Sequence, residues 1–297
     1  MDEKIIVILG PTASGKTKLA AKLASEFNGE IISADSRQVY KGMDIGTGKD
    51  FEDYIVNDNK IRYHLIDIID PTEEFNLYQF KKYFIRIFDE IVQRKKQAFL
   101  VGGSGLYLSS VIQNYELKEA ENNENDIFKL SEMNIDELKE ILFGLRANNH
   151  NTTDLTDKDR TIKAILAAKA EKNILNKKFI SVVIGIKLEK DEIKTRISQR
   201  LEKRLKSGMI EEVTKLINSG VSLQKLLFFG LEYKFIALYL RNELSYDEMF
   251  MKLNQAINKF AKRQATWFRK MEKEGIKINW IDGGDYEQAR SIILKLL

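Results

Sequence analysis

The segment GPTASGKT, residues 10–17, constrains the fold of this chain more than any other stretch. It matches G-x-x-x-x-G-K-[S/T], a pattern in which glycines let backbone N–H groups close around phosphate oxygens. The apolar run KIIVIL precedes it, and Leu19, Leu23 and Phe27 follow at the four-residue spacing of a helix. Strand, loop and helix in this order predict an α/β fold in which a P-loop belongs to a parallel sheet flanked by helices.

The residues of this loop are suited to binding phosphate. Lys16 can place a compact positive charge on a distal phosphate, Thr17 can hold Mg²⁺, and the helix N-terminus adds a partial positive charge. We predict that a polyphosphate, such as that of a nucleotide like ATP, binds along the whole loop. The residues in question are Gly10, Pro11, Thr12, Ala13, Ser14, Gly15, Lys16 and Thr17.

The motifs that accompany nucleotide hydrolysis are weak or missing in this sequence. The Asn-Lys pairs at Asn59, Asn176 and Asn258 all lack the Asp that completes the guanine-reading Asn-Lys-x-Asp. The candidates for a metal-holding acid after an apolar strand are Asp67 and Asp70, and the later run AFLVGG ends in glycines instead. Hydrolysis of the bound phosphate is therefore not the reaction that we expect.

The composition excludes several kinds of site. The chain of 297 residues has no cysteine and 2 histidines, which excludes disulfides and thiolate metal sites and suits a reducing compartment. Its longest apolar stretch, residues 179–186, is too short to cross a bilayer, and its first residues lack the layout of a signal peptide. Neither a coiled-coil pattern nor an apolar interface stripe is evident. We expect a cytoplasmic monomer that binds no membrane.

The middle of the chain differs from both ends. Residues 114–177 begin acidic and polar and continue with helical patterns, the second of which opens with Thr156 and Asp159 at capping-box spacing. No strand pattern occurs there. We predict a P-loop catalytic core formed by residues 1–113 and 178–297, and a small all-helical insertion domain formed by residues 114–177.

Periodicity predicts further elements in the core. Apolar runs favour strands and four-residue spacing favours helices. The expected elements are strands at 63–70, 97–103, 179–188 and 276–282, and helices at 76–96, from about 104, at 191–220 and at 246–274.

Asp35 stands at the carboxyl end of the strand that follows the first helix. In open parallel sheets, ligands bind at this edge. A carboxylate in this position can act as a general base, bind a metal or cap the next turn, and its position alone does not distinguish a base from a cap.

Longer motifs make the interpretation more specific. Three segments that follow GPTASGKT are not generic P-loop sequence. They are ISADSRQVYKGMDIGTGK, HLIDIIDP and LVGGSGLY. The later segments RISQRLEKRLKSGMIEEV, FFGLEYKFIALYLRNELSYDEM and AKRQATWFR extend the pattern over most of the chain outside residues 114–177. The chain resembles the tRNA dimethylallyltransferase (tRNA isopentenyltransferase) family, in its bacterial form without a zinc finger.

This resemblance implies a reaction. The family transfers a dimethylallyl group from dimethylallyl diphosphate to N6 of the adenine on the 3′ side of the tRNA anticodon, and releases diphosphate. The matching positions imply that Asp35 is the general base, that Thr17 holds diphosphate and Mg²⁺, and that Arg200 stabilises the leaving group. An adenine must leave its stack to react in this way.

The resemblance also implies contacts with the anticodon stem-loop. The segment 258–273 mixes basic and aromatic residues, which suits single-stranded RNA, although its spacing alone also fits an amphipathic helix with buried rings. Lys163 replaces an arginine of the family, and Ser104 replaces a common threonine. The implied tRNA-binding residues are Asp35, Ser36, Arg37, Gln38, Ser104, Asp159, Arg160, Lys163, Gly230, Lys262, Arg263, Gln264, Trp267 and Arg269.

Two other functions remain as alternatives. A P-loop kinase for a small molecule shares the loop and the position of Asp35, but it leaves AKRQATWFR and the helical insertion unexplained. An adenylate isopentenyltransferase that acts on free nucleotide shares the chemistry, but it has no use for the basic segment near the C-terminus.

Overall fold

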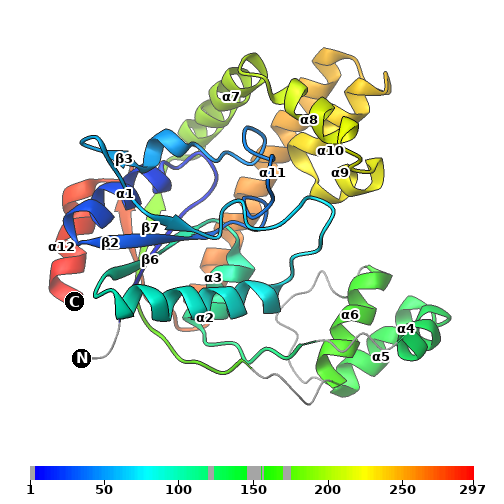
Figure 1. Cartoon of the computed structure of the whole chain (residues 1–297), viewed down its shortest axis with the longest axis horizontal. Helices are drawn as coiled ribbons and strands as arrows, with labels where there is room; N and C mark the ends of the chain where they lie inside the picture. The colour runs from blue at the N-terminus through cyan, green and yellow to red at the C-terminus, as the bar shows by residue number, and fades with distance from the viewer. Residues whose placement is uncertain (1–3, 120–123, 146–154, 156, 170–174) are drawn as a thin grey trace.

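A parallel sheet forms the centre of the molecule in a computed structural model that describes residues 4–119, 124–145, 155, 157–169 and 175–297. Its six strands lie in the order β5-β2-β6-β1-β7-β8, and every neighbouring pair is parallel (Figure 1). The strands are β1 (Lys4–Leu9), β2 (Gly29–Ala34), β5 (Tyr63–His64), β6 (Gln97–Gly102), β7 (Ile180–Lys187) and β8 (Ile278–Asp282). A small antiparallel pair, β3 (Ile55–Val56) and β4 (Asn59–Lys60), lies apart from this sheet.

Helices cover both faces of the sheet. Alternate residues of β1 point to opposite faces, so Ile5 and Val7 pack on one side and Ile6 and Ile8 on the other. The first side carries α2 (Leu77–Gln93), α3 (Gly105–Ile112) and the end of α11 (Tyr246–Lys273). The second carries α1 (Lys16–Glu26), the 3₁₀ turn η1 (Phe51–Tyr54) and α12 (Tyr286–Leu296). Because both faces are covered, the central strands are continuous apolar runs.

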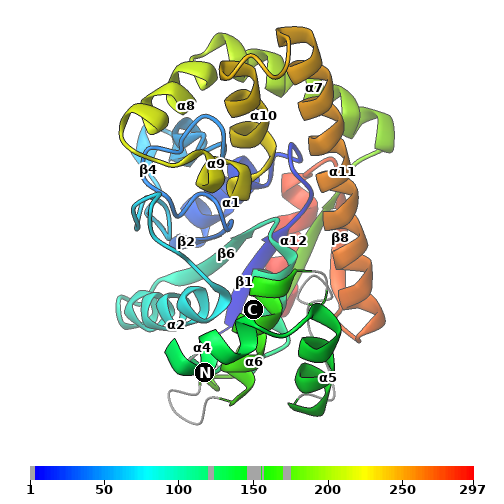
Figure 2. The same cartoon turned by 90° about the vertical axis from the view of Figure 1, so that its right-hand side faces the viewer.

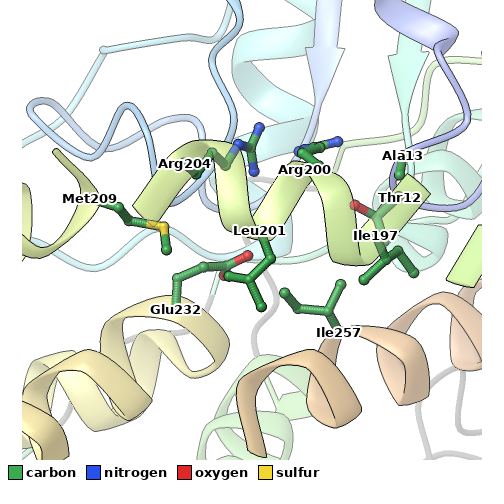
Figure 3. Close-up of a pocket in the computed structure, with 9 residues that line it drawn as sticks. All are labelled: Thr12, Ala13, Ile197, Arg200, Leu201, Arg204, Met209, Glu232 and Ile257. Carbon is green, nitrogen blue, oxygen red and sulfur yellow. The ribbon is translucent and has the colours of Figure 1, made fainter. Parts of the chain in front are cut away.

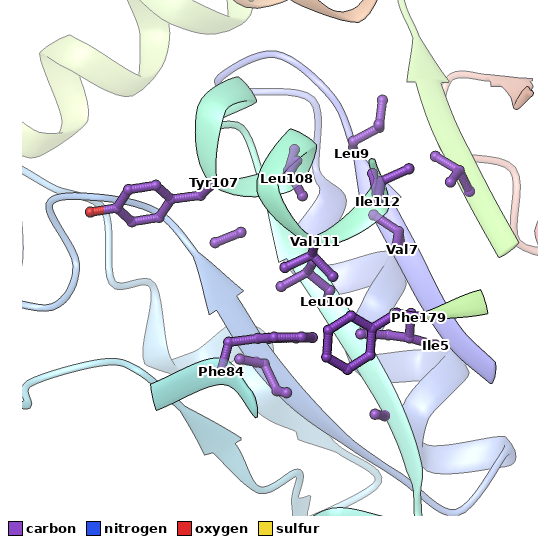
Figure 4. Close-up of a cluster of buried hydrophobic side chains, with 14 of the residues drawn as sticks. Ile5, Val7, Leu9, Phe84, Leu100, Tyr107, Leu108, Val111, Ile112 and Phe179 are labelled. Carbon is purple, nitrogen blue, oxygen red and sulfur yellow. The ribbon is translucent and has the colours of Figure 1, made fainter. Parts of the chain in front are cut away.

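The α2 side of the core is rich in aromatic rings. Phe80, Phe84 and Phe88 recur at four-residue spacing along α2, and all three are buried. Figure 4 shows Phe84 beside Phe179 in this cluster. The ring of Phe80 stacks on that of Tyr107 from α3 with 4.1 Å between centroids. Asn76 begins α2 with a capping box, which fixes where this aromatic row starts along the sheet.

A second group of helices covers the loops that follow β1 and β2. It comprises α7 (Lys190–Lys206), α8 (Met209–Asn218), α9 (Leu223–Phe229), α10 (Leu231–Leu240) and the first half of α11 (Figure 2). Its apolar core includes Val39 and Tyr40, which follow β2, and it packs against Ala13 of the phosphate loop. The functional edge of the sheet is thereby enclosed between strand ends and helices.

The described residues in the middle of the chain include the helices α4 (Glu124–Ser131), α5 (Ile135–Leu145) and α6 (Lys158–Lys169). They enclose an apolar cluster of their own, around Leu138, Leu142 and Ile165, and they lie beside α2, away from α7–α10 (Figures 1 and 2). The expected helices at 134–145 and 155–170 are confirmed as α5 and α6. Thr156 lies outside the described residues, and in the structure Asp157 accepts the N–H of Arg160 at the start of α6.

The expected strand at 63–70 is wrong beyond its first two residues. β5 ends at His64, because Leu65 and Asp67 adopt positive φ angles of 62° and 56°, which a strand does not tolerate. Ile69 then pairs with Tyr40 in an isolated bridge. α4 was not expected from the polar sequence around it. The other core elements occur where expected, with the predicted helix at 191–220 divided into α7 and α8. Among the described helices, none is long and apolar enough to cross a membrane.

Candidate functional site

The phosphate loop connects β1 to α1 at the edge of the sheet. Its backbone turns through left-handed conformations at Ala13 and Gly15, with φ of 62° and 79°. The Lys16 ammonium folds back onto the Pro11 carbonyl at 3.0 Å. Within the described chain, no side chain caps the N-terminus of α1, and the buried Ser14 hydroxyl has no hydrogen-bond partner. The N–H groups at the start of such a helix are the donors that hold an anion in loops of this kind, whereas Ser14 does not line the pocket.

Asp35 follows β2 directly and faces the same pocket as the phosphate loop. Its Oδ1 accepts the backbone N–H of Arg37 at 2.9 Å, which fixes the turn after the strand. The next residue, Ser36, donates its N–H to the Ser104 hydroxyl at 3.1 Å. The ends of β2 and β6 are thus tied together, as neighbouring parallel strands allow.

Arg200 of α7 lines the same pocket, and Arg204 of the same helix lines a smaller pocket beside it. Arg200 and Arg204 are one helical turn apart, and their side chains project in the same direction from α7 (Figure 3). Arg204 pairs with Asp50 at 3.2 Å, whereas within the described chain Arg200 has no hydrogen-bonded carboxylate. Burial and the adjacent charge of Arg204 lower the pKa of Arg200 to about 10. An anion in the pocket would relieve this repulsion.

The larger pocket is open to solvent, and its space amounts to about 730 Å³ when the solvent at its mouth is included. Its cations are Lys16, Arg37 and Arg200. Burial and the charge of Arg200 lower the pKa of Lys16 to about 8, although Asp35 acts in the opposite direction. The remaining lining residues include the carboxylates Asp35, Asp50, Asp53 and Glu232, and the aromatic rings of Tyr54 and Phe260.

The oxygen donors of the pocket fit a magnesium ion bound partly through phosphate. Thr17, Asp35 and Asp53 line it together, and burial followed by the charge of Asp50 raises the pKa of Asp53. In the described parts of the chain, no three His, Asp or Glu side chains form a ready-made metal cage. Mg²⁺ suits such a place, because it binds hard oxygens and keeps waters and substrate phosphates among its ligands.

The two alternative acids, Asp67 and Asp70, do not line this pocket. Asp67 pairs with the buried Lys49, and Asp70 is exposed and caps the turn at Thr72. Both therefore have a role in holding turns of the chain.

The residues predicted along α11 divide into two groups. Lys262, Arg263 and Arg269 are exposed. Gln264 is buried, accepts the N–H of Thr12 at 2.8 Å and donates to the Gly103 carbonyl at 2.9 Å.

Trp267, also on α11, is partly buried and donates its indole N–H to Ser109 of α3 at 2.8 Å. A Cβ at Gly105 would lie 2.3 Å from its ring, so only glycine fits beneath this tryptophan. Gln264 and Trp267 thus join α11 to the phosphate loop and to the segment after β6.

Of the other predicted tRNA contacts, Arg37 and Gln38 line the pocket, whereas those on α6 and at Gly230 do not. Asp159, Arg160 and Lys163 are exposed on α6, and Lys163 pairs with Glu74 at 2.7 Å. Gly230 connects α9 to α10 with φ of 67°, a conformation that suits glycine.

Sequence reasoning missed several lining residues. Phe260 faces the pocket with the guanidinium groups of Arg37 and Arg263 each 5.8 Å from its ring centroid. Its helical spacing had suggested a core position. Glu232 pairs with Arg37 at 2.7 Å. The two residues are 195 positions apart in the sequence, so no local pattern predicts this contact. Gly48 lies within the motif ISADSRQVYKGMDIGTGK and Asp50 directly follows it, but the motif indicated no role for either residue.

Comparison with known proteins shows relatives that match this chain over most of its length. A family model described as IPP transferase matches residues 38–271. The tRNA dimethylallyltransferase 1 of Syntrophus aciditrophicus is 46% identical over 296 residues, which cover 98% of this chain and 97% of the relative. That of Geotalea uraniireducens is 46% identical over 300 residues, covering 100% and 98%.

Solved structures show the same likeness. The tRNA isopentenylpyrophosphate transferase of Bacillus halodurans superposes with a TM-score of 0.70 at 31% identity, covering 99% of this chain and 94% of that one. The Staphylococcus epidermidis enzyme gives 0.70 at 28% identity, covering 99% of both chains. Matches of this extent, to sequences and to structures alike, show that this chain belongs to the tRNA dimethylallyltransferase family.

Proposed function

We propose that this protein transfers a dimethylallyl group from dimethylallyl diphosphate to N6 of the adenine on the 3′ side of a tRNA anticodon. Membership of the family supports an enzyme that prenylates tRNA. The observation that carries the finer proposal is the convergence of Lys16, Arg200 and Asp35 on one pocket. The cations Lys16 and Arg200 suit a departing diphosphate, and the carboxylate of Asp35 suits the acceptance of a proton.

The proposed reaction forms one bond and breaks another. The lone pair of N6 attacks the first carbon of the allyl group, and the bond from that carbon to the diphosphate oxygen breaks with its electron pair. Lys16 and Arg200 stabilise the negative charge that appears on the diphosphate. Asp35 accepts the proton that N6 loses, and its hydrogen bond from Arg37 holds the carboxylate in place for this step.

The reaction of the family needs a divalent metal, and we propose Mg²⁺. Thr17 at the start of α1, with the carboxylates of Asp35 or Asp53, would hold it together with phosphate oxygens. Such an ion supplies further positive charge for the leaving group when bound. The residues of the phosphate loop would hold the diphosphate through their backbone N–H groups.

We assign tRNA binding to two surfaces. The exposed cations Lys262, Arg263 and Arg269 lie on the helix that carries Phe260 to the pocket, so charge that tracks the RNA backbone continues to the place of reaction. Residues 114–177, as a separate insertion domain, would meet the anticodon stem through Asp159, Arg160 and Lys163. Ser36, Gln38, Ser104 and Gly230 are proposed to meet the anticodon loop. We further propose a cytoplasmic monomer.

A comparison of acceptors tests the proposal. Purified protein, Mg²⁺ and labelled dimethylallyl diphosphate are incubated with unmodified tRNA or, separately, with AMP or ATP. Label on tRNA and none on free nucleotide is the expected result. Label on AMP would make the protein a prenyltransferase of free nucleotides, and ATP consumption without transfer would make it a kinase.

A further inference from the structure

The segment of residues 43–50, here called the arginine-facing loop, lies directly against the two arginines of α7. A Cβ at Gly48 would lie 2.4 Å from Nη2 of Arg200 and 2.0 Å from Nη2 of Arg204, so the loop backbone touches both guanidinium groups. The same loop supplies Asp50, the partner of Arg204. Its shape therefore determines which arginine is paired and which remains available to the pocket.

A buried carboxylate outside the pocket holds this loop. Glu212 of α8 accepts backbone N–H groups from three consecutive residues, Asp44 at 2.9 Å, Ile45 at 2.6 Å and Gly46 at 3.0 Å. Tyr233 of α10 adds its hydroxyl at 2.9 Å. Burial and the nearby Glu212 raise the pKa of Tyr233 well above its usual value, so this hydroxyl stays a donor. Glu212 itself does not line the pocket.

The other end of the loop is held by a buried cation. The Lys49 side chain has no exposed surface, and it donates to the Tyr40 carbonyl at 2.6 Å, to Asp44 at 2.8 Å and to Asp67. Gln38 donates to the Gly48 carbonyl at 3.0 Å from inside the pocket wall. The loop is thus fixed from α8, from α10 and from the end of β2, and the arginines are positioned against a rigid surface.

We propose that Glu212 is a positioning residue for the transfer reaction, which it serves by fixing the arginine-facing loop so that Arg200 stays unpaired and directed at the diphosphate. Without the carboxylate, three N–H groups lose a charged acceptor and Gly48 is free to shift. Asp50 would then leave Arg204, and Arg200 would lose the surface that directs it. The inference rests on the proposed function, since it concerns the leaving group of that reaction.

The test uses the full-length protein and inorganic diphosphate with Mg²⁺, titrated by calorimetry. In Glu212→Gln the amide keeps one oxygen acceptor but turns an N–H₂ group toward backbone donors. Some N–H groups of the loop therefore lose their acceptor. We expect the Kd for diphosphate to rise by about 10–100-fold, and the KM for dimethylallyl diphosphate with it. The Kd for tRNA should change by less than about threefold, because the exposed cations of α11 are untouched.

The matched control is Glu211→Gln, one residue earlier on α8 and exposed, which we expect to bind diphosphate as the wild type does. Glu212→Asp keeps the charge on a shorter side chain and should recover part of the affinity. If Glu212→Gln does not fold, Tyr233→Phe removes one donor to the same carboxylate and should weaken diphosphate binding by about threefold or more.

The outcomes separate this inference from the proposed function. An unchanged Kd for diphosphate in folded Glu212→Gln, or equal losses for diphosphate and tRNA, would overturn the positioning role. Because the titration does not depend on transfer, a wild type that binds diphosphate but modifies no tRNA would overturn the proposed function instead.

Discussion

At the scale of single residues, two cations of the pocket, Lys16 and Arg200, lie where burial disfavours their charge. Burial lowers the pKa of both Lys16 and Arg200, and each is destabilised further by an adjacent arginine. A buried cation without a partner is costly, and an anionic ligand removes that cost. The positive charges of the pocket therefore favour an anionic ligand, as the proposed function requires.

A pH dependence follows from Lys16. Its pKa of about 8 means that the free protein loses this charge as the pH rises through 8, whereas an ordinary lysine would keep it to about 10. Affinity for inorganic diphosphate should therefore fall by about tenfold between pH 7 and pH 9. Calorimetric titrations across this range measure it. Lys16→Arg should bind less well at pH 7 but lose most of this dependence, and a wild-type affinity that stays flat would contradict the assignment.

The role of Asp35 has its own test. Asp35→Asn retains an acceptor for the Arg37 N–H but cannot take a proton, so turnover should fall by about 10²–10⁴-fold while tRNA binding stays intact. Single-turnover transfer and filter binding measure the two quantities. Asp70→Asn, at an exposed turn outside the pocket, serves as the control. Wild-type turnover in Asp35→Asn would remove this residue as the base.

At the scale of elements, α11 joins the parts of the site. Its first half packs in the cluster of α7–α10, and its second half packs on the sheet. Between them, Gln264 holds the phosphate loop at Thr12 and the segment after β6 at Gly103. The helix α11 thus sets the distance between the phosphate loop and the group of helices that includes α7, which carries Arg200.

We expect Gln264→Ala to destabilise the protein by about 1–3 kcal/mol, because it leaves a Thr12 N–H and a Gly103 carbonyl without partners. Diphosphate binding should weaken as well. Lys262→Ala, two residues away and exposed, should leave the free energy of unfolding within about 0.5 kcal/mol of the wild type. Urea unfolding of the two variants measures the difference, and equal stabilities would show that Gln264 does not hold the loop.

The sequence predicted those elements whose signal is local. The spacing of apolar residues around the loop at 10–17 identified β1 and α1, and the row Phe80, Phe84, Phe88 identified α2. The strand expected at 63–70 failed because Leu65 and Asp67 take positive φ, which an apolar run does not reveal. The periodicity of apolar residues indicates which residues are buried, but it does not indicate their backbone φ angles.

The site was predictable only in part for a related reason. The phosphate loop and Asp35 follow strands directly, so topology alone brings them to one edge. Arg200 came from family resemblance. Two other contacts join segments that are distant in the sequence, so residue spacing does not predict them. They are the ion pair of Arg37 with Glu232 and the hydrogen bonds of Glu212 to the arginine-facing loop. Gln264 and Trp267 sit in a basic segment typical of RNA binding, yet their polar groups bond within the protein.

At the scale of the whole molecule, the formal charge of +4 is too small to explain RNA binding by itself. The placement of charge on α11 matters more. We expect Lys262→Ala, Arg263→Ala and Arg269→Ala each to reduce the slope of log K against log salt for tRNA by about 1. Lys22→Ala, exposed on α1, should leave the slope unchanged. Binding measured at several salt concentrations decides this, and an unchanged slope in the α11 variants would move the RNA surface elsewhere.

In the proposed function, one pocket releases diphosphate and prenylates an adenine of tRNA. The most direct test is mass spectrometry of nuclease fragments from unmodified tRNA treated with the protein, Mg²⁺ and dimethylallyl diphosphate. We expect a single added dimethylallyl group, on N6 of the adenine that follows the anticodon, with release of one diphosphate per group. A modified ribose, a modified base elsewhere, or diphosphate release without modification of tRNA would contradict it.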